Sequence, residues 1–196
     1  NWWVERVRAN LSTCDIIRID HFRGFEAYWA VPYGDDTAIN GQWVKGPGID
    51  LFNKIKEELG ELPIIAEDLG LMTQGVIDLR EATGFPGMKI LGFAFDSEEE
   101  NDYLPHTYTK NCVVYTGTHD NDTLIGWFTK AKEKDKQFAR DYLNSQTDDN
   151  IHWDAIRGAW SSVANMAIAP IQDFLGLGSE ARINTPGLAS GNWQWR

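Results

Sequence analysis

Five short apolar runs recur along the chain, separated by segments with the spacing of helices. Apolar residues occupy both faces of each run, which is typical of strands in a parallel sheet that helices cover on both sides. The predicted strands are residues 15–20, 63–68, 88–95, 112–115 and 166–171. The predicted helices are residues 1–12, 51–59, 73–83, 123–143 and 150–165. This alternation predicts an α/β fold.

The number of strands favours a barrel over an open sheet. A complete (β/α)8 TIM barrel needs roughly 250 residues, and the chain has 196. About five strands therefore predict the C-terminal part of such a barrel, with its N-terminal strands missing. An open doubly wound sheet is the alternative, but no predicted strand is followed by the glycine fingerprint of dinucleotide-binding folds. We expect residues 1–196 to belong to one barrel domain.

The composition of the chain argues against several classes of binding partner and against a disulfide or metal site. The formal net charge is −11, and an acidic chain repels phosphate backbones, so nucleic acid is not an expected partner. The apolar runs are too short to span a bilayer, so no membrane partner is expected. Cys14 and Cys112 lie far apart and are predicted to be two buried thiols rather than a disulfide or a metal site. Residues 24–50 contain Gly and Pro throughout and predict a long loop.

Acidic residues end three of the predicted strands. Asp20 ends the first strand, Glu67 and Asp68 end the second, and Asp120 and Asp122 follow the strand 112–115. In α/β barrels the strand ends of this side meet at one mouth, where active sites lie. Two uses of clustered carboxylates fit this pattern: glycoside chemistry, which needs a nucleophile and an acid, and the binding of a divalent metal.

Arg18 favours glycoside chemistry over a metal site. It lies two residues before Asp20, so on a strand both side chains point to the same face. A guanidinium there stabilises the ionised form of Asp20, as a nucleophile requires, and opposes the binding of a metal cation. The sequence also has no pair of histidines at the spacing of a zinc site. No metal and no cofactor are therefore expected.

Three segments resemble the catalytic segments of amylomaltases, which are 4-alpha-glucanotransferases of glycoside hydrolase family 77. They are residues 18–25 (RIDHFRGF), 65–70 (IAEDLG) and 115–123 (YTGTHDNDT). The resemblance extends to residues 43–48, 86–89, 169–173 and 192–196. Because the ordered set covers essentially the whole chain, the sequence is identified as a member of this family, as the C-terminal portion of its catalytic barrel.

The resemblance implies a role for each strand-end residue. Asp20 is the expected nucleophile, which forms a covalent glucosyl-enzyme. Glu67 is the expected general acid and then the base, and Asp120 is expected to stabilise the transition state. Retention of configuration requires the carboxyl groups of nucleophile and acid to lie about 5–5.5 Å apart. Apart from the resemblance, Asp68 and Asp122 are expected to cap helices, with support of the neighbouring site residues as the alternative.

Five further residues are candidates for substrate binding. Arg18 would orient Asp20. The resemblance places His119 at the glucose unit where cleavage occurs, and His21 among the residues that line the site. Trp29 and Trp43 lie in the predicted loop, where aromatic faces can stack on sugar rings. The tail departs from the family pattern at Leu188, where a threonine is expected and no hydroxyl is present.

The implied function is transfer of α-1,4-glucan segments between maltooligosaccharides by a retaining double displacement, in the cytoplasm. The partners are a maltooligosaccharide or glucan donor and an acceptor. Two alternatives remain: a retaining hydrolase of the alpha-amylase type, and a non-catalytic sugar-binding fragment. A partial barrel also leaves strand edges unpaired, so we expect this chain alone to be poorly stable or to self-associate.

Overall fold

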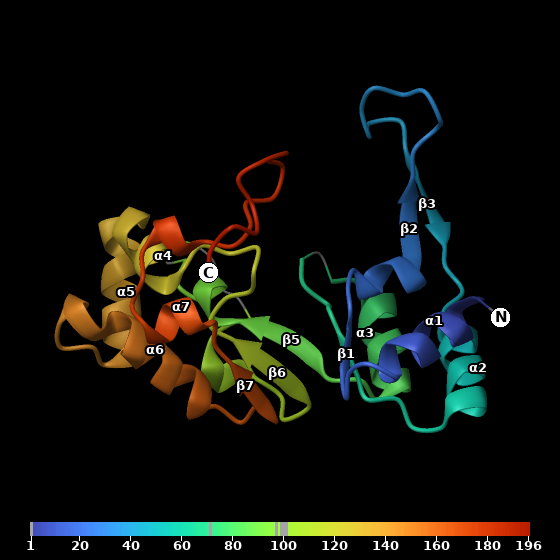
Figure 1. Cartoon of the computed structure of the whole chain (residues 1–196), viewed down its shortest axis with the longest axis horizontal. Helices are drawn as coiled ribbons and strands as arrows, with labels where there is room; N and C mark the ends of the chain where they lie inside the picture. Colours follow the sequence, from blue (N-terminus) through green and yellow to red (C-terminus); the bar gives the residue numbers. More distant parts are fainter. Residues whose placement is uncertain (1, 71, 97, 99–101) are drawn as a thin grey trace. The chain divides into compact units, whose positions relative to one another are not determined.

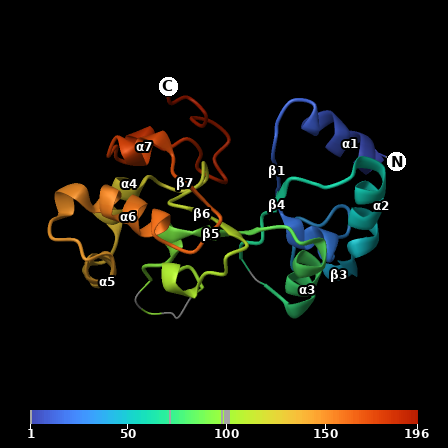
Figure 2. The same cartoon turned by 90° about the horizontal axis from the view of Figure 1, so that it is seen from below.

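The computed structural model describes residues 2–70, 72–96, 98 and 102–196. The chain forms two compact units, residues 1–88 and residues 89–196. Figures 1 and 2 show the helices and strands of each unit in two views. Each unit is described separately below.

The first unit contains a parallel pair of strands flanked by helices. Strand β1 (Ile17–Ile19) pairs with β4 (Ile64–Ala66), in the register that places Ile17 opposite Ile64. The helices of this unit are α1 (Trp2–Leu11), α2 (Ile49–Leu59) and α3 (Gln74–Thr83). The prediction of two strands and three helices here is confirmed, with each strand shorter than its apolar run.

The sequence predicted a long loop over residues 24–50, but this segment also contains regular structure. It contains an antiparallel hairpin of β2 (Ala27–Ala30) and β3 (Gln42–Lys45), which extends away from the helices of its unit in Figure 1. Aromatic and β-branched residues favour such pairing, and here Trp29 lies opposite Trp43. The long connection 31–41 separates the two strands in sequence and conceals their pairing. Within the residues that the structure describes there are therefore seven strands, of which five are those predicted.

Aromatic side chains form the centre of the first unit. Phe22 is fully buried and stacks on Phe52, with 5.4 Å between ring centroids. Phe85 packs edge-on against Phe52 at 5.5 Å. A second cluster joins α1 to α2 through Val4, Val7 and Ile55. Since burial of each large apolar side chain contributes about 1.5–3 kcal/mol, these clusters fix the helices against the parallel pair.

The second unit contains most of a three-stranded sheet with helices. The strand order is β5 (Gly87–Ile90), β6 (Cys112–Tyr115) and β7 (Met166–Ile168), and β6 and β7 pair in parallel. The predicted strand 88–95 ends early because a 3₁₀ turn begins at Leu91. The predicted strand 166–171 ends before Pro170, which precedes the short helix α7 (Ile171–Phe174).

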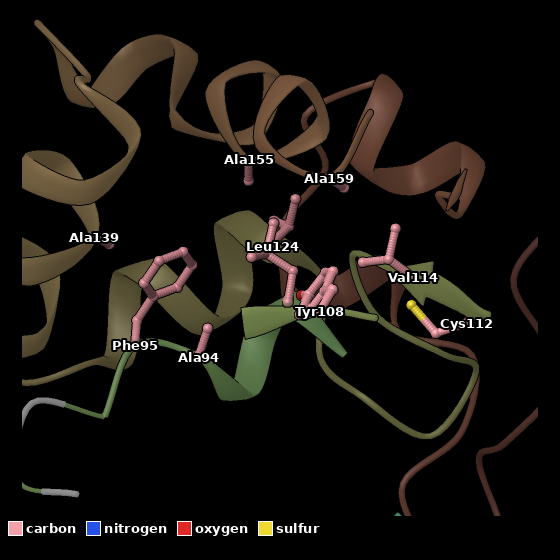
Figure 3. Packing of buried hydrophobic residues seen from close by; sticks show 10 residues of the cluster. Ala94, Phe95, Tyr108, Cys112, Val114, Leu124, Ala139, Ala155 and Ala159 are labelled. Carbon is pink, nitrogen blue, oxygen red and sulfur yellow. The ribbon is translucent and has the colours of Figure 1, made fainter. Parts of the chain in front are cut away.

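The helices predicted over residues 123–143 are confirmed as two helices. They are α4 (Leu124–Lys130) and α5 (Glu133–Leu143), separated by Ala131 and Lys132 in extended conformation. Helix α6 (Ile151–Trp160) is shorter than predicted, and Ser161 is its C-cap residue. These helices cover a core in which Phe95, Val114 and Leu124 are buried together, as Figure 3 shows.

Only one of the two cysteines is buried as predicted. Cys112 lies on β6 in this core, whereas Cys14 is exposed in the turn after α1. Cys14 is exposed because the chain leaves the helix at Leu11 and enters β1 only at Ile17. Within the described residues, no helix is long and apolar enough to cross a membrane.

Candidate active site

The end of β1 presents the predicted pair of Arg18 and Asp20. The Arg18 guanidinium donates from Nη2 to Oδ1 of Asp20 at 2.9 Å, so the two side chains do share a face of the strand. The Asp20 side chain is 79% exposed, which leaves its second oxygen accessible. A charge-assisted bond of this kind is directional, so it fixes the orientation of the carboxylate.

Glu67 follows β4 and lies beside the residues that follow β1. The parallel ladder continues past both strands, because the Glu67 N–H donates to the Ile19 carbonyl and the Phe22 N–H donates to the Glu67 carbonyl. The Glu67 side chain accepts from the His21 N–H at 2.6 Å. Its other oxygen accepts from the Leu69 N–H at 3.0 Å. Both oxygens of the carboxylate are therefore held by backbone donors.

His21 has an unusual backbone conformation. Its φ of 48° and ψ of 52° lie in the left-handed region, which is unfavourable for a residue with a side chain. This conformation directs the N–H of His21 to the Glu67 carboxylate, while the side chain of the preceding residue, Asp20, bonds Arg18. The ring lies over Gly24, where an added Cβ would come within 3.2 Å of Cδ2. Backbone strain of this kind is common where geometry serves function.

Asp68 was expected to cap a helix, but it stabilises the fold near Glu67 instead. Oδ1 of Asp68 accepts from the Met88 N–H at 2.7 Å, and Oδ2 forms an ion pair with Nε of Arg80 at 3.3 Å. Both side chains are largely buried, and a Cβ at Gly87 would collide with the carboxylate. The ion pair attaches α3 to the loop that follows β4, and the bond from Met88 attaches this loop to β5. The close approach of the carboxylate explains the glycine at position 87.

The two tryptophans predicted to bind sugar lie on the hairpin. Trp29 and Trp43 face each other edge-on at 5.3 Å, and both are partly exposed. The Trp29 indole N–H donates to the Ala38 carbonyl at 2.9 Å, while Gly41 leaves room for the ring because it has no Cβ. The Arg23 guanidinium lies 4.4 Å from the Trp43 ring centroid. The two rings are thus held in place, with accessible faces.

His119 and Asp120 lie in the second unit, in the loop that follows β6. Nε2 of His119 lies 3.4 Å from Oδ2 of Asp120. Oδ1 of Asp120 accepts from the Asn184 side chain at 2.5 Å, and its backbone carbonyl accepts from Arg182 at 2.7 Å. The His119 ring also lies beside the Trp193 ring, with 5.2 Å between centroids. The C-terminal loop therefore holds this pair of candidate residues.

Sequence reasoning did not single out Arg182, Asn184 or Trp193 as site residues. Their contacts with residues 119 and 120 join positions more than sixty residues apart, and no local pattern records such a contact. The one signal was indirect: residues 192–196 belong to the motifs that resemble the family. A motif in a glycine-rich tail indicates a functional loop.

Asp122 stabilises the loop between β6 and α4, and it does not cap α4. Thr123 is the cap residue, because its hydroxyl accepts from the Gly126 N–H at 3.0 Å. Oδ2 of Asp122 accepts from Lys130 and from Ser179, each at 2.7 Å. Burial raises the pKa of Asp122, but the hydrogen bonds from Lys130 and Ser179 outweigh burial and hold the pKa below its ordinary value.

A buried carboxyl group connects the end of β6 to two helices. Asp173 is 2% exposed, accepts from the Thr116 hydroxyl at 2.6 Å, and accepts from the Leu124 N–H at 2.8 Å. Burial raises the pKa of Asp173, against the opposing effect of these hydrogen bonds. The connection between α7, α4 and β6 sets where the loop with His119 begins, and sequence reasoning did not find it.

The predicted site residues thus form two groups. The first unit brings together Arg18, Asp20, His21 and Glu67, with Trp29 and Trp43 on its hairpin. The second unit brings together His119 and Asp120. Among the described residues, no three His, Cys, Asp or Glu side chains gather closely enough to hold a metal ion.

Comparisons with known proteins agree on one family. A family model described as 4-alpha-glucanotransferase matches residues 1–196. The 4-alpha-glucanotransferase of Clostridium butyricum is 56% identical over 197 residues, which cover all of this chain and 40% of that protein. The 4-alpha-glucanotransferase of Synechocystis is 55% identical, again over the whole chain and 39% of the relative. The chain therefore spans about 40% of the length of the curated relatives it matches.

Solved structures agree with the sequence relatives. The structure described as amylomaltase from Streptococcus agalactiae in complex with acarbose has a TM-score of 0.95 and 40% identity, over all of this chain and 40% of that one. The predicted C-terminal placement of the chain within such proteins is not confirmed. Family membership does not depend on that placement, since the match covers every residue: this chain belongs to the 4-alpha-glucanotransferase family.

Proposed function

We propose that the chain contributes to the active site of an enzyme that transfers α-1,4-glucan segments between maltooligosaccharides. The observation that carries the proposal is the parallel pairing of β1 and β4, which places the Arg18–Asp20 pair and Glu67 on adjacent strand ends. An ionised carboxylate beside a second carboxyl group is the arrangement that retaining glycoside chemistry needs. Its relatives carry the name of this activity.

The first half of the reaction forms a covalent intermediate. The Asp20 carboxylate attacks the anomeric carbon of the donor glucan, and the bond from that carbon to the leaving glycosidic oxygen breaks. Glu67 donates its proton to this oxygen, which leaves as the hydroxyl of the departing sugar. Arg18 supports the role of Asp20, because its guanidinium orients one carboxylate oxygen and leaves the other accessible.

The second half of the reaction passes the glucan to an acceptor. Glu67, now ionised, takes the proton from the 4-hydroxyl of the acceptor sugar, whose oxygen attacks the anomeric carbon and releases Asp20. Backbone bonds from His21 and Leu69 hold Glu67 in one orientation for both steps. Asp120 would hydrogen-bond the hydroxyls of the distorted sugar in the transition state, and His119 would bind the same glucose unit.

The hairpin tryptophans are proposed as a platform for the glucan. The rings of Trp29 and Trp43 are fixed by the Ala38 carbonyl and the Arg23 guanidinium, yet each remains partly exposed. A rigid and accessible aromatic face binds a sugar ring with little loss of conformational entropy. Amylomaltase from Streptococcus agalactiae, which resembles this chain, has been solved in complex with acarbose.

The catalytic domain is proposed to be a TIM barrel to which residues 1–196 belong. Strands β1 and β4 are parallel neighbours, as are β6 and β7, and the order β5-β6-β7 follows the chain. The Ala66 N–H also donates to the Pro86 carbonyl, which extends the pairing of β4 toward the segment before β5. Sequential parallel strands with intervening helices are the pattern of such barrels.

A cytoplasmic location is proposed for the enzyme. Localisation of the tagged protein in its source cell would test this location.

Trapping the glucosyl-enzyme tests the proposed mechanism directly. Glu67→Gln in the full natural protein removes the acid and base, and an α-glucosyl fluoride supplies a leaving group that needs no proton. We expect a glucosyl unit to accumulate on the peptide that contains Asp20, as detected by mass spectrometry of the digest. A glucosyl unit on another residue, or complete absence of labelling in a folded variant, would contradict the proposal.

A further inference from the structure

We propose that Arg182, Asn184 and Trp193 act as positioning residues for His119 and Asp120. These three residues of the C-terminal loop are called the clasp here. The inference rests on the proposed function, since it assigns His119 and Asp120 to the glucan site. It goes beyond that function, because neither the family match nor the relatives' names assign a role to the clasp.

Arg182 fixes the backbone of Asp120. Its Nη2 donates to the Asp120 carbonyl at 2.7 Å, and its Nε donates to the Asn184 carbonyl at 2.8 Å. One planar guanidinium thus joins the backbone of the loop after β6 to the backbone of the C-terminal loop. A lysine cannot reproduce two such bonds from one rigid group, because its ammonium is a single point donor on a flexible stem.

Asn184 fixes the carboxylate of Asp120. The Asn184 side chain donates to Oδ1 at 2.5 Å, while Oδ2 faces Nε2 of His119 at 3.4 Å. The Asn184 N–H also donates to the His119 carbonyl at 3.0 Å. The Asp120 side chain is 45% exposed, so it is held from behind while part of it stays accessible. This is the support that a group acting on a transition state requires, because its geometry must be set before the substrate arrives.

Trp193 flanks the His119 ring, and its own position is held against a backbone preference. The two ring centroids lie 5.2 Å apart, and the planes meet at 34°. Trp193 has a φ of 62°, which a residue with a side chain rarely adopts. Its N–H donates to the Ile183 carbonyl at 2.7 Å, and the preceding Asn192 bonds both N–H and C=O of Thr185. The loop therefore holds an unfavourable conformation that brings the ring to His119.

Core packing does not account for this ring. Trp193 is 55% exposed, so most of its apolar surface is not removed from water. An indole that is strained into place and left half in solvent contributes little burial. Its defined contact is the His119 ring, which the resemblance and the proposed function place at the substrate.

The test compares substitutions that break the clasp with matched controls in the full natural protein. Trp193→Leu removes the ring, and Trp193→Phe keeps an aromatic face. Arg182→Met removes both guanidinium bonds, and Arg182→Lys keeps the charge. Trp160→Leu is the control, because Trp160 lies in the same unit, is 56% exposed and packs on Phe174. Glucan transfer from maltotriose gives kcat and KM, and the NMR signal of the His119 ring reports its neighbour.

We expect Trp193→Leu and Arg182→Met to lower kcat about tenfold or more with a smaller change in KM, because they disturb a group that acts in the transition state. Trp193→Phe should restore most of kcat, and Trp160→Leu should match the wild type. The His119 signal should shift in Trp193→Leu through loss of the ring current. Equal kcat in folded Trp193→Leu, Arg182→Met and wild type would overturn the positioning role while leaving the function standing.

Failure of the proposed function has a different signature. In that case the wild type itself would not lengthen maltotriose, and the role of the clasp in this reaction would fall with it. An unchanged His119 signal in Trp193→Leu would overturn the contact itself, whatever the activity. If Trp193→Leu does not fold, the comparison of Arg182→Lys with Trp193→Phe still tests the positioning role. Only the lysine variant loses the two hydrogen bonds to the Asp120 and Asn184 carbonyls.

Discussion

At the scale of residues, the chemistry depends on how each carboxylate is held. Asp20 is oriented by a guanidinium, Glu67 by two backbone N–H groups, and Asp120 by an amide side chain. These three environments differ in charge and in exposure. A site that runs acid, base and nucleophile chemistry needs such differences, because identical carboxylates would share one behaviour.

Asp20→Asn is the sharpest substitution at this scale. An amide is not a nucleophile, so we expect glucan transfer to fall by about a thousandfold or more. The melting temperature should change little, since the side chain is 79% exposed. The control is Asp15→Asn, which alters an exposed carboxyl before the same strand. Retained activity in Asp20→Asn would remove Asp20 from the role of nucleophile.

The lowered pKa of Asp122 predicts how the free energy of unfolding depends on pH. Its folded pKa lies below the ordinary value of 3.8 because bonds from Lys130 and Ser179 outweigh burial. A depressed folded pKa contributes stability that is present above the unfolded pKa and is lost as pH falls through the folded one. Asp122→Asn should therefore lower the free energy of unfolding by about 1–3 kcal/mol near neutral pH.

The same argument gives the pH window and a control. The difference in unfolding free energy between wild type and Asp122→Asn should shrink as pH falls below about 4. Asp36→Asn changes an exposed carboxyl and should show no such difference. Urea unfolding of the full natural protein at several pH values measures both. A difference that is independent of pH would contradict the depressed pKa of folded Asp122.

At the scale of elements, the buried Asp173 connects α7 with α4 and β6. Asp173→Ala leaves the Thr116 hydroxyl and the Leu124 N–H without their acceptor in a buried site, which should cost about 2–5 kcal/mol. Asp173→Asn keeps an oxygen that can accept from one of the two donors, so it should be milder. Unfolding free energies of both variants test this, and an alanine variant as stable as the asparagine variant would contradict it.

The five strands of the sheets β1-β4 and β5-β6-β7 could be predicted because each is a local apolar run. The hairpin could not, because β2 and β3 pair across the connection 31–41 and neither is a long apolar run. Strand ends were also missed, as where the strand predicted over residues 88–95 ends at Ile90 and a 3₁₀ turn follows. Local composition records the type of an element better than its boundaries.

The candidate site was predictable to the extent that it follows strand ends. The Arg18–Asp20 pair follows from the alternation of side chains along β1, and the proximity of Glu67 follows from parallel pairing. The contacts of Asp120 with Arg182 and Asn184 depend on how the C-terminal loop folds back, which no spacing in the sequence encodes. Helix capping by Asp68 and Asp122 was wrong because Asp68 pairs with Arg80 of α3, while Asp122 pairs with Lys130 in the last turn of α4 and accepts from Ser179.

At the scale of the molecule, residues 1–196 alone are expected to self-associate. The second unit exposes apolar side chains on α6, β7 and α7, and β7 ends the order of its sheet. These side chains are Trp153, Trp160, Met166, Ile168, Ile171 and Leu175. Exposed apolar surface beside a strand edge is the surface that associates. Sedimentation of the isolated chain at rising concentration should show growing mass, and a monomer with cooperative unfolding throughout would contradict this.

The products formed from maltotriose test the central claim of glucan transfer most directly. The full natural protein that contains this sequence is incubated with maltotriose, and the products are separated by length, with the Asp20→Asn variant in parallel. The account predicts glucose together with maltopentaose and longer chains from the wild type, and unchanged maltotriose from the variant. Only shorter sugars from the wild type would indicate hydrolysis, and longer chains from the variant would exclude Asp20 as the nucleophile.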